Sequence, residues 1–136
     1  KLYPSTLNIE IKKTKFLAIT KKNNKDYLIG TNGKLIEIKD TISNIPFIFG
    51  NINVQNFLNF KKNIDNSNFK FNEIENLYYF KSNRWDVKTK EGLSLKLPSN
   101  LTVQKLNLIY EIIQKKNFSG NKTLDFRQSN MMVIDE

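Results

Sequence analysis

The sequence predicts an α+β domain: a mixed, mostly antiparallel β-sheet with two packed helices and an exposed C-terminal edge strand. Three observations support this fold class. Short apolar runs of strand length, bounded by Asn, Gly, Ser or Pro, recur along the chain. Two segments, at about 53–65 and about 101–116, repeat apolar residues with the period of a helix. The last apolar run, Met131 to Ile134, has no later strand to cover it.

The N-terminal part predicts strands and one hairpin. Apolar and polar residues alternate over 7–11, which is typical of a half-buried strand, and 16–19 is a second apolar run. The apolar runs at 27–29 and 35–38 flank Asn32-Gly33, a pair that provides the positive φ angles of a tight turn. We therefore expect these two runs to pair as a hairpin.

The segments around this hairpin are expected to be less regular. The polar residues 21–25 predict a loop, and 45–50 predicts a short buried connector, because Pro46 disfavours a central strand. The helix at about 53–65 follows, with Asn53 as its candidate N-terminal cap.

The C-terminal half predicts three more strands and the second helix. The strand candidates are 74–80, 84–89 and 93–97, and 98–100 is expected to end the sheet and cap the helix at about 101–116. The helix has a regular apolar stripe, formed by Val103, Leu106, Ile109, Tyr110 and Ile113. We expect the structural core to include Trp85, Leu95, Leu106 and Ile109.

The last segment predicts a second hairpin. Leu124 and Phe126 lead into a polar turn, Gln128-Ser129-Asn130, and the run from Met131 to Ile134 leaves it. If this last run lies at the edge of the sheet, its backbone donors and acceptors are available to a strand from another chain.

Composition argues against catalysis. The chain has no Cys and no His, which excludes thiol chemistry and removes the commonest general base and metal ligand. Ser94 and Lys96 have the spacing of alternate residues on one strand face, which explains them better than a catalytic pair does. Asp125, Asp135 and Glu136 are not spaced as a metal cluster. We expect no catalytic residue, no metal and no cofactor.

The net charge of +9 raises the alternative of a soluble basic α+β module that binds nucleic acid. Nearly all of the charge is scattered lysine, whereas nucleic-acid binders more often cluster Arg and aromatic residues. A weak attraction to anionic lipid head groups is also compatible with this charge. No stretch approaches the roughly 18 apolar residues of a membrane span.

Several motifs, in order along nearly the whole chain, resemble one family: the extracytoplasmic β-domain of the bacterial cell-division proteins FtsQ and DivIB. They are Tyr3-Pro4-Ser5-Thr6-Leu7, Asn32-Gly33-Lys34-Leu35-Ile36 followed by Ile45-Pro46-Phe47-Ile48-Phe49-Gly50, Arg84-Trp85-Asp86-Val87 with Gly92-Leu93, Leu124-Asp125-Phe126-Arg127, and the strand from Asn130 to Val133.

The resemblance implies that residues 1–19 end a POTRA domain and that 20–136 form the β-domain. It implies a non-enzymatic scaffold of the bacterial inner membrane, held by an upstream transmembrane helix, on the periplasmic side and enriched at the division septum. The implied partners are division proteins of the FtsB/FtsL type, bound by strand addition, and no nucleic acid is expected. The residues that would bind them are Arg84, Asp125, Phe126, Arg127, Gln128, Asn130, Met131, Met132, Val133 and Ile134.

The two arginines support two interpretations of equal weight. Arg84 and Arg127 are the only Arg in a lysine-rich chain, and Arg is preferred where a planar group holds a carboxylate. That carboxylate belongs either to a partner or to this chain, for example to Asp86 or Asp125.

Overall fold

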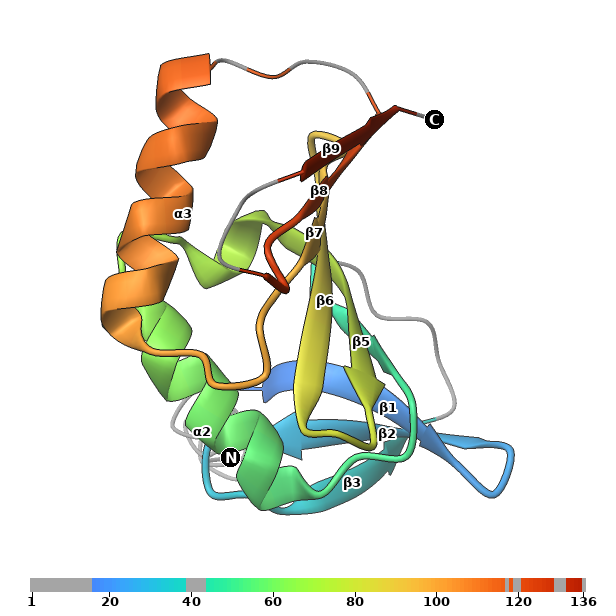
Figure 1. Cartoon of the computed structure of the whole chain (residues 1–136). Helices are drawn as coiled ribbons and strands as arrows, with labels where there is room; N and C mark the ends of the chain where they lie inside the picture. The colour runs from blue at the N-terminus through green and yellow to red at the C-terminus, as the bar shows by residue number, and fades with distance from the viewer. Residues whose placement is uncertain (1–15, 39–43, 117, 119–120, 129–131, 136) are drawn as a thin grey trace, which may run out of the picture.

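In the described part of the chain, a single mixed sheet carries two helices on one face (Figure 1). The computed structural model describes residues 16–38, 44–116, 118, 121–128 and 132–135, the last four by their backbone. The predicted strand at 7–11 lies outside the described residues. Along the sheet the order is β3-β2-β1-β4-β5-β6-β7-β8-β9, so that β3 and β9 form its two edges. The α+β class and the C-terminal edge strand are as predicted.

The strands are β1 (Phe16–Lys22), β2 (Lys25–Gly30), β3 (Leu35–Ile38), β4 (Phe47–Phe49), β5 (Ile74–Phe80), β6 (Arg84–Thr89), β7 (Ser94–Lys96), β8 (Lys122–Asp125) and β9 (Met132–Asp135). The helices are α2 (Val54–Asp65) and α3 (Val103–Lys116), with a short 3-10 turn, η1 (Phe71–Glu73), before β5.

Two tight turns shape the N-terminal hairpins. The predicted β2–β3 hairpin is present, with Gly33 at φ 81° and the Asn32 side chain accepting a hydrogen bond from the N–H of Lys34 (3.0 Å). The predicted loop at 21–25 is wrong, because β1 and β2 continue to a two-residue turn. Asn23 and Asn24 both have positive φ angles, 52° and 65°, which asparagine tolerates and which suit a type I′ turn.

The predicted connector at 45–50 contains a central strand, β4, which is parallel to both β1 and β5. Pro46 lies one residue before the strand, so its missing N–H is not needed in the ladder. The carbonyl of Pro46 accepts a hydrogen bond from the N–H of Ile19 (2.9 Å). The proline therefore marks the start of the strand and does not exclude it.

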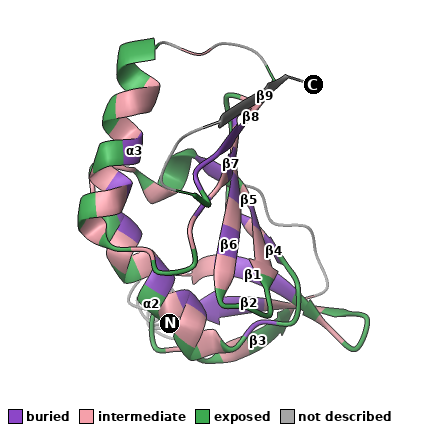
Figure 2. Ribbon diagram, viewed as in Figure 1, coloured by how far each residue is buried: buried purple, intermediate pink, exposed green. Residues whose placement is uncertain are grey.

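The core lies between the sheet and the helices (Figure 2). One row of residues crosses five neighbouring strands in register, and each member is at most 4% exposed: Ile48, Leu77, Val87, Leu95 and Leu124. The helices cover this face with residues spaced three or four apart, namely Phe57, Phe60, Ile64, Leu106 and Ile109.

The residues expected in the core are buried. Leu106 and Ile109 are buried on the side of α3 that faces the sheet, and Leu95 is buried on β7. Trp85 is buried under α2, where its ring stacks on that of Phe60 with centroids 4.6 Å apart. The two helices thus cover different parts of the sheet.

The predicted cap of α2 is confirmed, and the predicted cap of α3 is wrong. Asn53 caps α2 as expected, because its side chain accepts from the N–H of Gln55 (2.8 Å). In α3 the cap is Thr102, whose hydroxyl oxygen accepts from the N–H of Lys105 (3.2 Å). The helix starts at Val103, so Thr102 has the position from which a side chain reaches the third helical N–H, and Asn100 lies too far upstream.

Candidate interaction surface

The C-terminal edge of the sheet consists of β8 and β9. β8 runs parallel to β7, and β9 is antiparallel to β8, with Asp125 opposite Met132 and Leu124 opposite Val133. β9 ends the strand order, so no other described strand pairs with its outer side. The hairpin predicted at the end of the chain is therefore a pair of strands at a sheet edge.

The direction of the β8 backbone groups follows from one hydrogen bond. The N–H of Phe126 donates to the carbonyl of Lys96 on β7 (2.8 Å). The backbone groups of successive strand residues point to opposite sides within the sheet. Leu124 therefore turns its backbone groups toward β7 as Phe126 does, and Asp125 turns its own toward β9.

This alternation continues into β9. Met132 is the register partner of Asp125, so its N–H points inward, toward β8, and the same holds for Ile134 two residues later. Val133, between them, directs its N–H to the open edge. The open edge thus offers a backbone donor to an added strand.

A row of alternating charges lies next to this edge, on the face of the sheet away from the helices. Asp86, Lys96 and Asp125 are neighbours in register on β6, β7 and β8. Arg84 forms an ion pair with Asp86, and Arg127 forms one with Asp125. We call these five residues the charged row.

The two arginines of the charged row differ in exposure. The side chain of Arg84 is 15% exposed, and its guanidinium lies 4.4 Å from the ring centroid of Phe80. The side chain of Arg127 is 45% exposed and holds the carboxylate of Asp125, which also accepts from the N–H of Arg127 (3.0 Å). Both arginines are paired within the chain, and Arg127 keeps surface available for a further contact.

The pKa values of the two carboxylates of the row are shifted in opposite directions. Burial raises the pKa of Asp86 above its ordinary value, although Arg84 acts to lower it. The hydrogen bonds and charge of Arg127 lower the pKa of Asp125, and Asp125 in turn raises the pKa of Arg127. Asp125, near the edge of the sheet, therefore keeps its negative charge to a lower pH than Asp86 does, which lies further inside.

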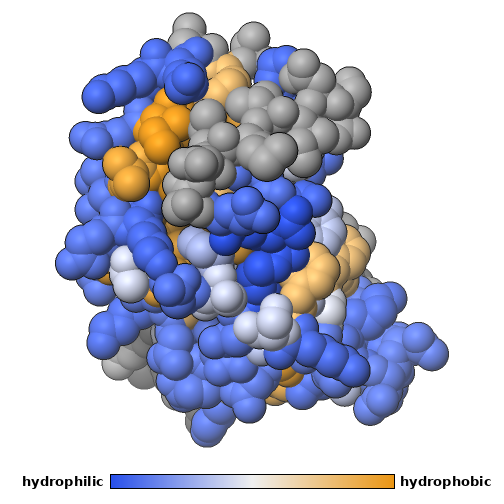
Figure 3. Space-filling view, viewed as in Figure 1, coloured by the Kyte–Doolittle hydropathy of each residue, from blue (hydrophilic) through white to orange (hydrophobic). Residues whose placement is uncertain are grey.

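An apolar groove lies between α3 and the end of β8. Its hollow measures about 360 Å³ and is lined by Pro98, Asn100, Lys105, Leu108, Ile109, Ile112, Phe126, Arg127 and Gln128. Leu108 is 59% exposed and contributes an apolar side chain to this groove. Figure 3 shows hydrophobic side chains reaching the surface on the side of the molecule where α3 lies.

The structure brings only some of the predicted site residues together. Asp125, Arg127 and Gln128 lie at the end of β8, and Arg84 joins them through the charged row. Phe126 is 7% exposed and packs in the core. Asn130 and Met131 lie outside the described residues, and Met132, Val133 and Ile134 are placed by backbone alone.

Sequence reasoning missed the groove. Leu108 and Ile112 are one turn apart on α3; Leu108 lies off the stripe that faces the sheet, and half-buried Ile112 lies at the margin of that stripe. Two apolar residues at a helical spacing outside the buried stripe were the available signal.

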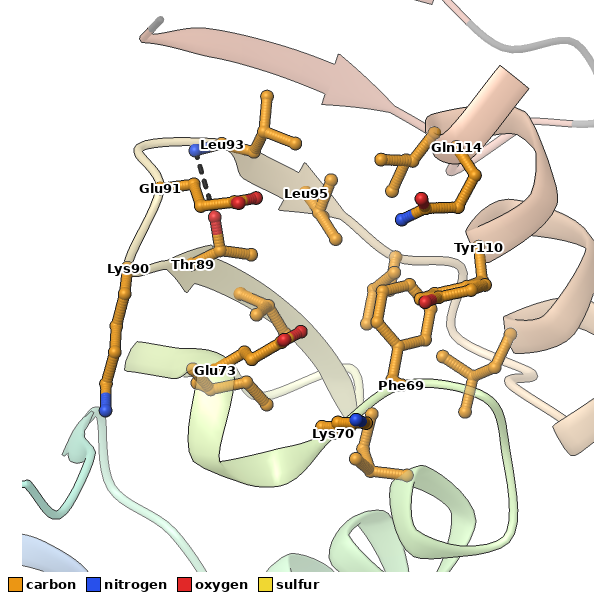
Figure 4. Close-up of a pocket in the computed structure, with 16 residues that line it drawn as sticks. Phe69, Lys70, Glu73, Thr89, Lys90, Glu91, Leu93, Leu95, Tyr110 and Gln114 are labelled. Atoms are coloured by element: carbon orange, nitrogen blue, oxygen red, sulfur yellow. Dashed lines mark hydrogen bonds between the residues drawn. The ribbon is translucent and has the colours of Figure 1, made fainter. Parts of the chain in front are cut away.

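A second hollow lies beneath α3. It is a cavity of about 110 Å³ between α3 and strands β6 and β7, with apolar walls such as Leu95 and polar groups such as Glu91 and Gln114 at its rim (Figure 4). Within the described ranges no group of three or more potential ligands is placed to hold a metal ion. The helices of the described part are also too short or too polar to cross a membrane.

Comparison with known proteins identifies a family and a solved structure of similar fold. A family model, described as the C-terminal part of the cell-division protein FtsQ/DivIB, matches residues 18–131. A solved structure, the major extracytoplasmic domain of the cell-division protein DivIB from Geobacillus stearothermophilus in its trans isomer, is similar in fold. Its TM-score is 0.51 at 14% identity, covering 78% of this chain and 98% of that one. No curated protein matches the sequence.

Proposed function

Since this chain belongs to the FtsQ/DivIB family of cell-division proteins, as its motifs predicted, we propose that it is a non-enzymatic scaffold that binds coiled-coil division partners of the FtsB/FtsL type at its C-terminal edge. The family's extracytoplasmic domain lies on the periplasmic side of the membrane. Recruitment to the septum, an upstream membrane helix and a POTRA domain ending at residue 19 are parts of the same proposal.

The observation that carries the proposal is the position of β9. It is the last strand in the sheet order, and Val133 directs a backbone N–H away from β8. Natural proteins commonly cover, shorten or charge an edge of this kind, because it otherwise pairs with other chains. A partner segment in extended conformation would complete the ladder.

Two neighbouring features supply side-chain contacts for the same partner. The half-exposed guanidinium of Arg127 suits an acidic side chain, and the groove around Leu108 suits an apolar one. Backbone pairing would provide affinity, and these two contacts would provide specificity.

The alternative, binding of nucleic acid, has less support. Arginine is the side chain that holds a phosphate with two parallel hydrogen bonds. Both arginines are instead paired with carboxylates, Arg84 with Asp86 and Arg127 with Asp125. A protein partner with its own mixed charges fits the charged row better.

Hydrogen exchange on the complex tests the proposal. The purified domain is mixed with purified coiled-coil partners of the FtsB/FtsL type, and amide exchange is followed with and without them. We expect the Val133 amide to gain protection, because it would donate to the added strand, whereas amides of the β1–β2 hairpin should be unchanged. Binding without new protection in β9 would refute strand addition. Tighter binding to DNA, falling steeply with salt, would favour the alternative.

A further inference from the structure

A second surface lies at the other end of the molecule from β9. The parallel strands β1, β4 and β5 end together there, next to the β1–β2 hairpin and the β5–β6 turn. In Figure 1 these elements lie at the lower end, and β8 and β9 lie at the upper end. We call this surface the basic aromatic rim; its residues are Lys21, Lys22, Lys25, Phe49, Phe80 and Lys81.

The aromatic part of the rim is unusually exposed. Phe49 and Phe80 are 45% and 40% exposed, and they are two of the four large hydrophobic residues exposed in the described part of the chain. The Phe49 ring stacks on Tyr78, with centroids 5.0 Å apart and planes 11° apart, and Arg84 lies over the Phe80 ring. These contacts hold the two rings at the surface, where each is available to an apolar group of a ligand.

The lysines of the rim are only weakly neutralised. Lys21 lies 3.8 Å from Asp26, and Lys25 lies 3.9 Å from Glu37, in pairs whose side chains are about half exposed. Exposed pairs at such distances contribute little and are screened by salt. In the described part of the chain, no carboxylate forms an ion pair with Lys22.

A shallow hollow joins Lys21 and Lys22 to the Phe49 ring. It measures about 650 Å³, and no carboxylate lines it; its walls are Lys21, Lys22, Asn23, Phe47, Ile48, Phe49, Gly50 and Asn51. The site therefore combines cations, amides and aromatic rings, a set that suits an anion carrying an apolar part.

We propose that the basic aromatic rim docks on an anionic phospholipid surface. Lysine attracts such a surface as a mobile point charge, and exposed phenylalanine inserts at the level of the head groups. A polypeptide partner suits the rim less well, because both sides of the β4 backbone are already paired and cannot accept another strand. The inference rests on the proposed function in one respect, since an upstream membrane helix would hold the domain near a bilayer.

Vesicle flotation of this domain tests the proposal. The vesicles contain phosphatidylethanolamine with phosphatidylglycerol, or phosphatidylcholine alone. We expect binding only to the anionic vesicles, weakening with added salt, and a loss of about fivefold in affinity for each of Lys21→Gln, Lys22→Gln and Lys25→Gln. Phe49→Ser should also weaken binding, and lowering the salt concentration should not restore it.

Matched variants at the other end of the molecule serve as controls. Lys90→Gln, Lys115→Gln and Lys116→Gln remove the same charge, and Leu108→Ser removes another exposed apolar side chain. These variants should keep vesicle binding, and the rim variants should keep partner binding and melting temperature.

Equal losses of vesicle binding in rim and control variants would show that only the net charge of the protein matters, and would overturn the proposal. Competition by polyglutamate at equal charge would assign the rim to an acidic protein instead. If the domain does not bind vesicles, protection of the Val133 amide by the division partners is still expected, so the two proposals can be refuted independently.

Discussion

Arg127 holds the carboxylate of Asp125 with two nitrogens: its Nε lies 2.9 and 3.1 Å from the two oxygens, and its Nη2 lies 2.5 Å from one of them. Asp125 is buried, whereas the Arg127 side chain is 45% exposed. The pair thus closes the end of β8 and still presents a cation to solvent. This arrangement reconciles the two interpretations of the arginine, because an internal pair does not prevent an external contact.

Acid should destabilise the domain partly through Asp125. Its pKa is lowered in the folded state by Arg127, so folding favours the ionised form. The resulting stability is complete above the unfolded pKa of about 4 and is lost as the pH falls through the lower folded value. Urea unfolding at a series of acid pH values should show this loss in the parent protein and not in Asp125→Asn.

Asp86 provides the contrast of opposite sign. Burial raises its folded pKa, so folding favours the protonated form, and the associated stability is lost as the pH rises from about 4 through the folded value. In the same urea series, the parent protein should lose this stability as the pH rises above about 4, and Asp86→Asn should not show the loss. If the two Asn variants change the pH profile in the same direction, the opposite environments of the two carboxylates are misassigned.

Reversing the two arginines should separate folding from binding. Arg84→Glu replaces a mostly buried cation that contacts Asp86 and Phe80, and we expect a loss of about 3 kcal/mol in unfolding free energy. Arg127→Glu alters a pair whose arginine is half exposed, and should cost less, about 1 kcal/mol.

Calorimetry on the folded Arg127→Glu variant should then show partner affinity reduced by at least about tenfold, because an attraction becomes a repulsion. Normal binding by Arg127→Glu would restrict this arginine to its internal pair.

Two leucines of α3 measure which face of the helix is packed. Leu106 is fully buried, so Leu106→Ala should lower the unfolding free energy by about 2–5 kcal/mol. Leu108, two residues later, is 59% exposed, and Leu108→Ala should change it by less than about 0.5 kcal/mol. Chemical unfolding of both variants checks the assignment, and similar losses would contradict it.

The parts of the fold that the sequence predicted well depend on local signals. The period of α2, its cap Asn53 and the Asn32-Gly33 turn each lie within a few residues of the structure they specify. The position of β4 does not, because its parallel pairing with β1 and β5 joins segments far apart in the chain. Pro46 disfavours a central strand in the sequence, whereas β4 begins at the very next residue.

The interaction surface shows the same division. The pairing of Arg127 with Asp125 was foreseen as one alternative, since the two residues are close in sequence. The charged row requires the registers of β6, β7 and β8, which periodicity alone does not give. The groove was missed because Leu108 and Ile112 become a surface only where α3 meets the end of β8.

Gly50 should be intolerant of any side chain. Its φ is +114°, and an added Cβ would lie 2.5 Å from the carbonyl oxygen of Tyr79, so the backbone of β5 would have to shift. Gly33 also has a positive φ, +81°, but a Cβ there meets only side chains at ordinary distances. Thermal unfolding should show a loss of about 1 kcal/mol for Gly33→Ala and a clearly larger one for Gly50→Ala.

A proline at Val133 should separate the binding edge from the fold. Proline removes one backbone N–H and is tolerated in a strand only where that N–H is not needed. Met132 and Ile134 direct their N–H groups toward β8, so Met132→Pro and Ile134→Pro should lower the melting temperature. The N–H of Val133 points to the open edge, so Val133→Pro should keep the melting temperature and lose partner binding.

This alternation distinguishes strand addition from binding by side chains alone. The register of Asp125 with Met132 assigns the two outcomes to alternate residues of β9. Val133→Ala is the matched control, because it also removes the valine side chain but keeps the N–H. If a partner were bound only through side chains, Val133→Pro and Val133→Ala would weaken it equally. Strand addition therefore requires that the proline variant, still folded, lose far more affinity in calorimetry than the alanine variant does.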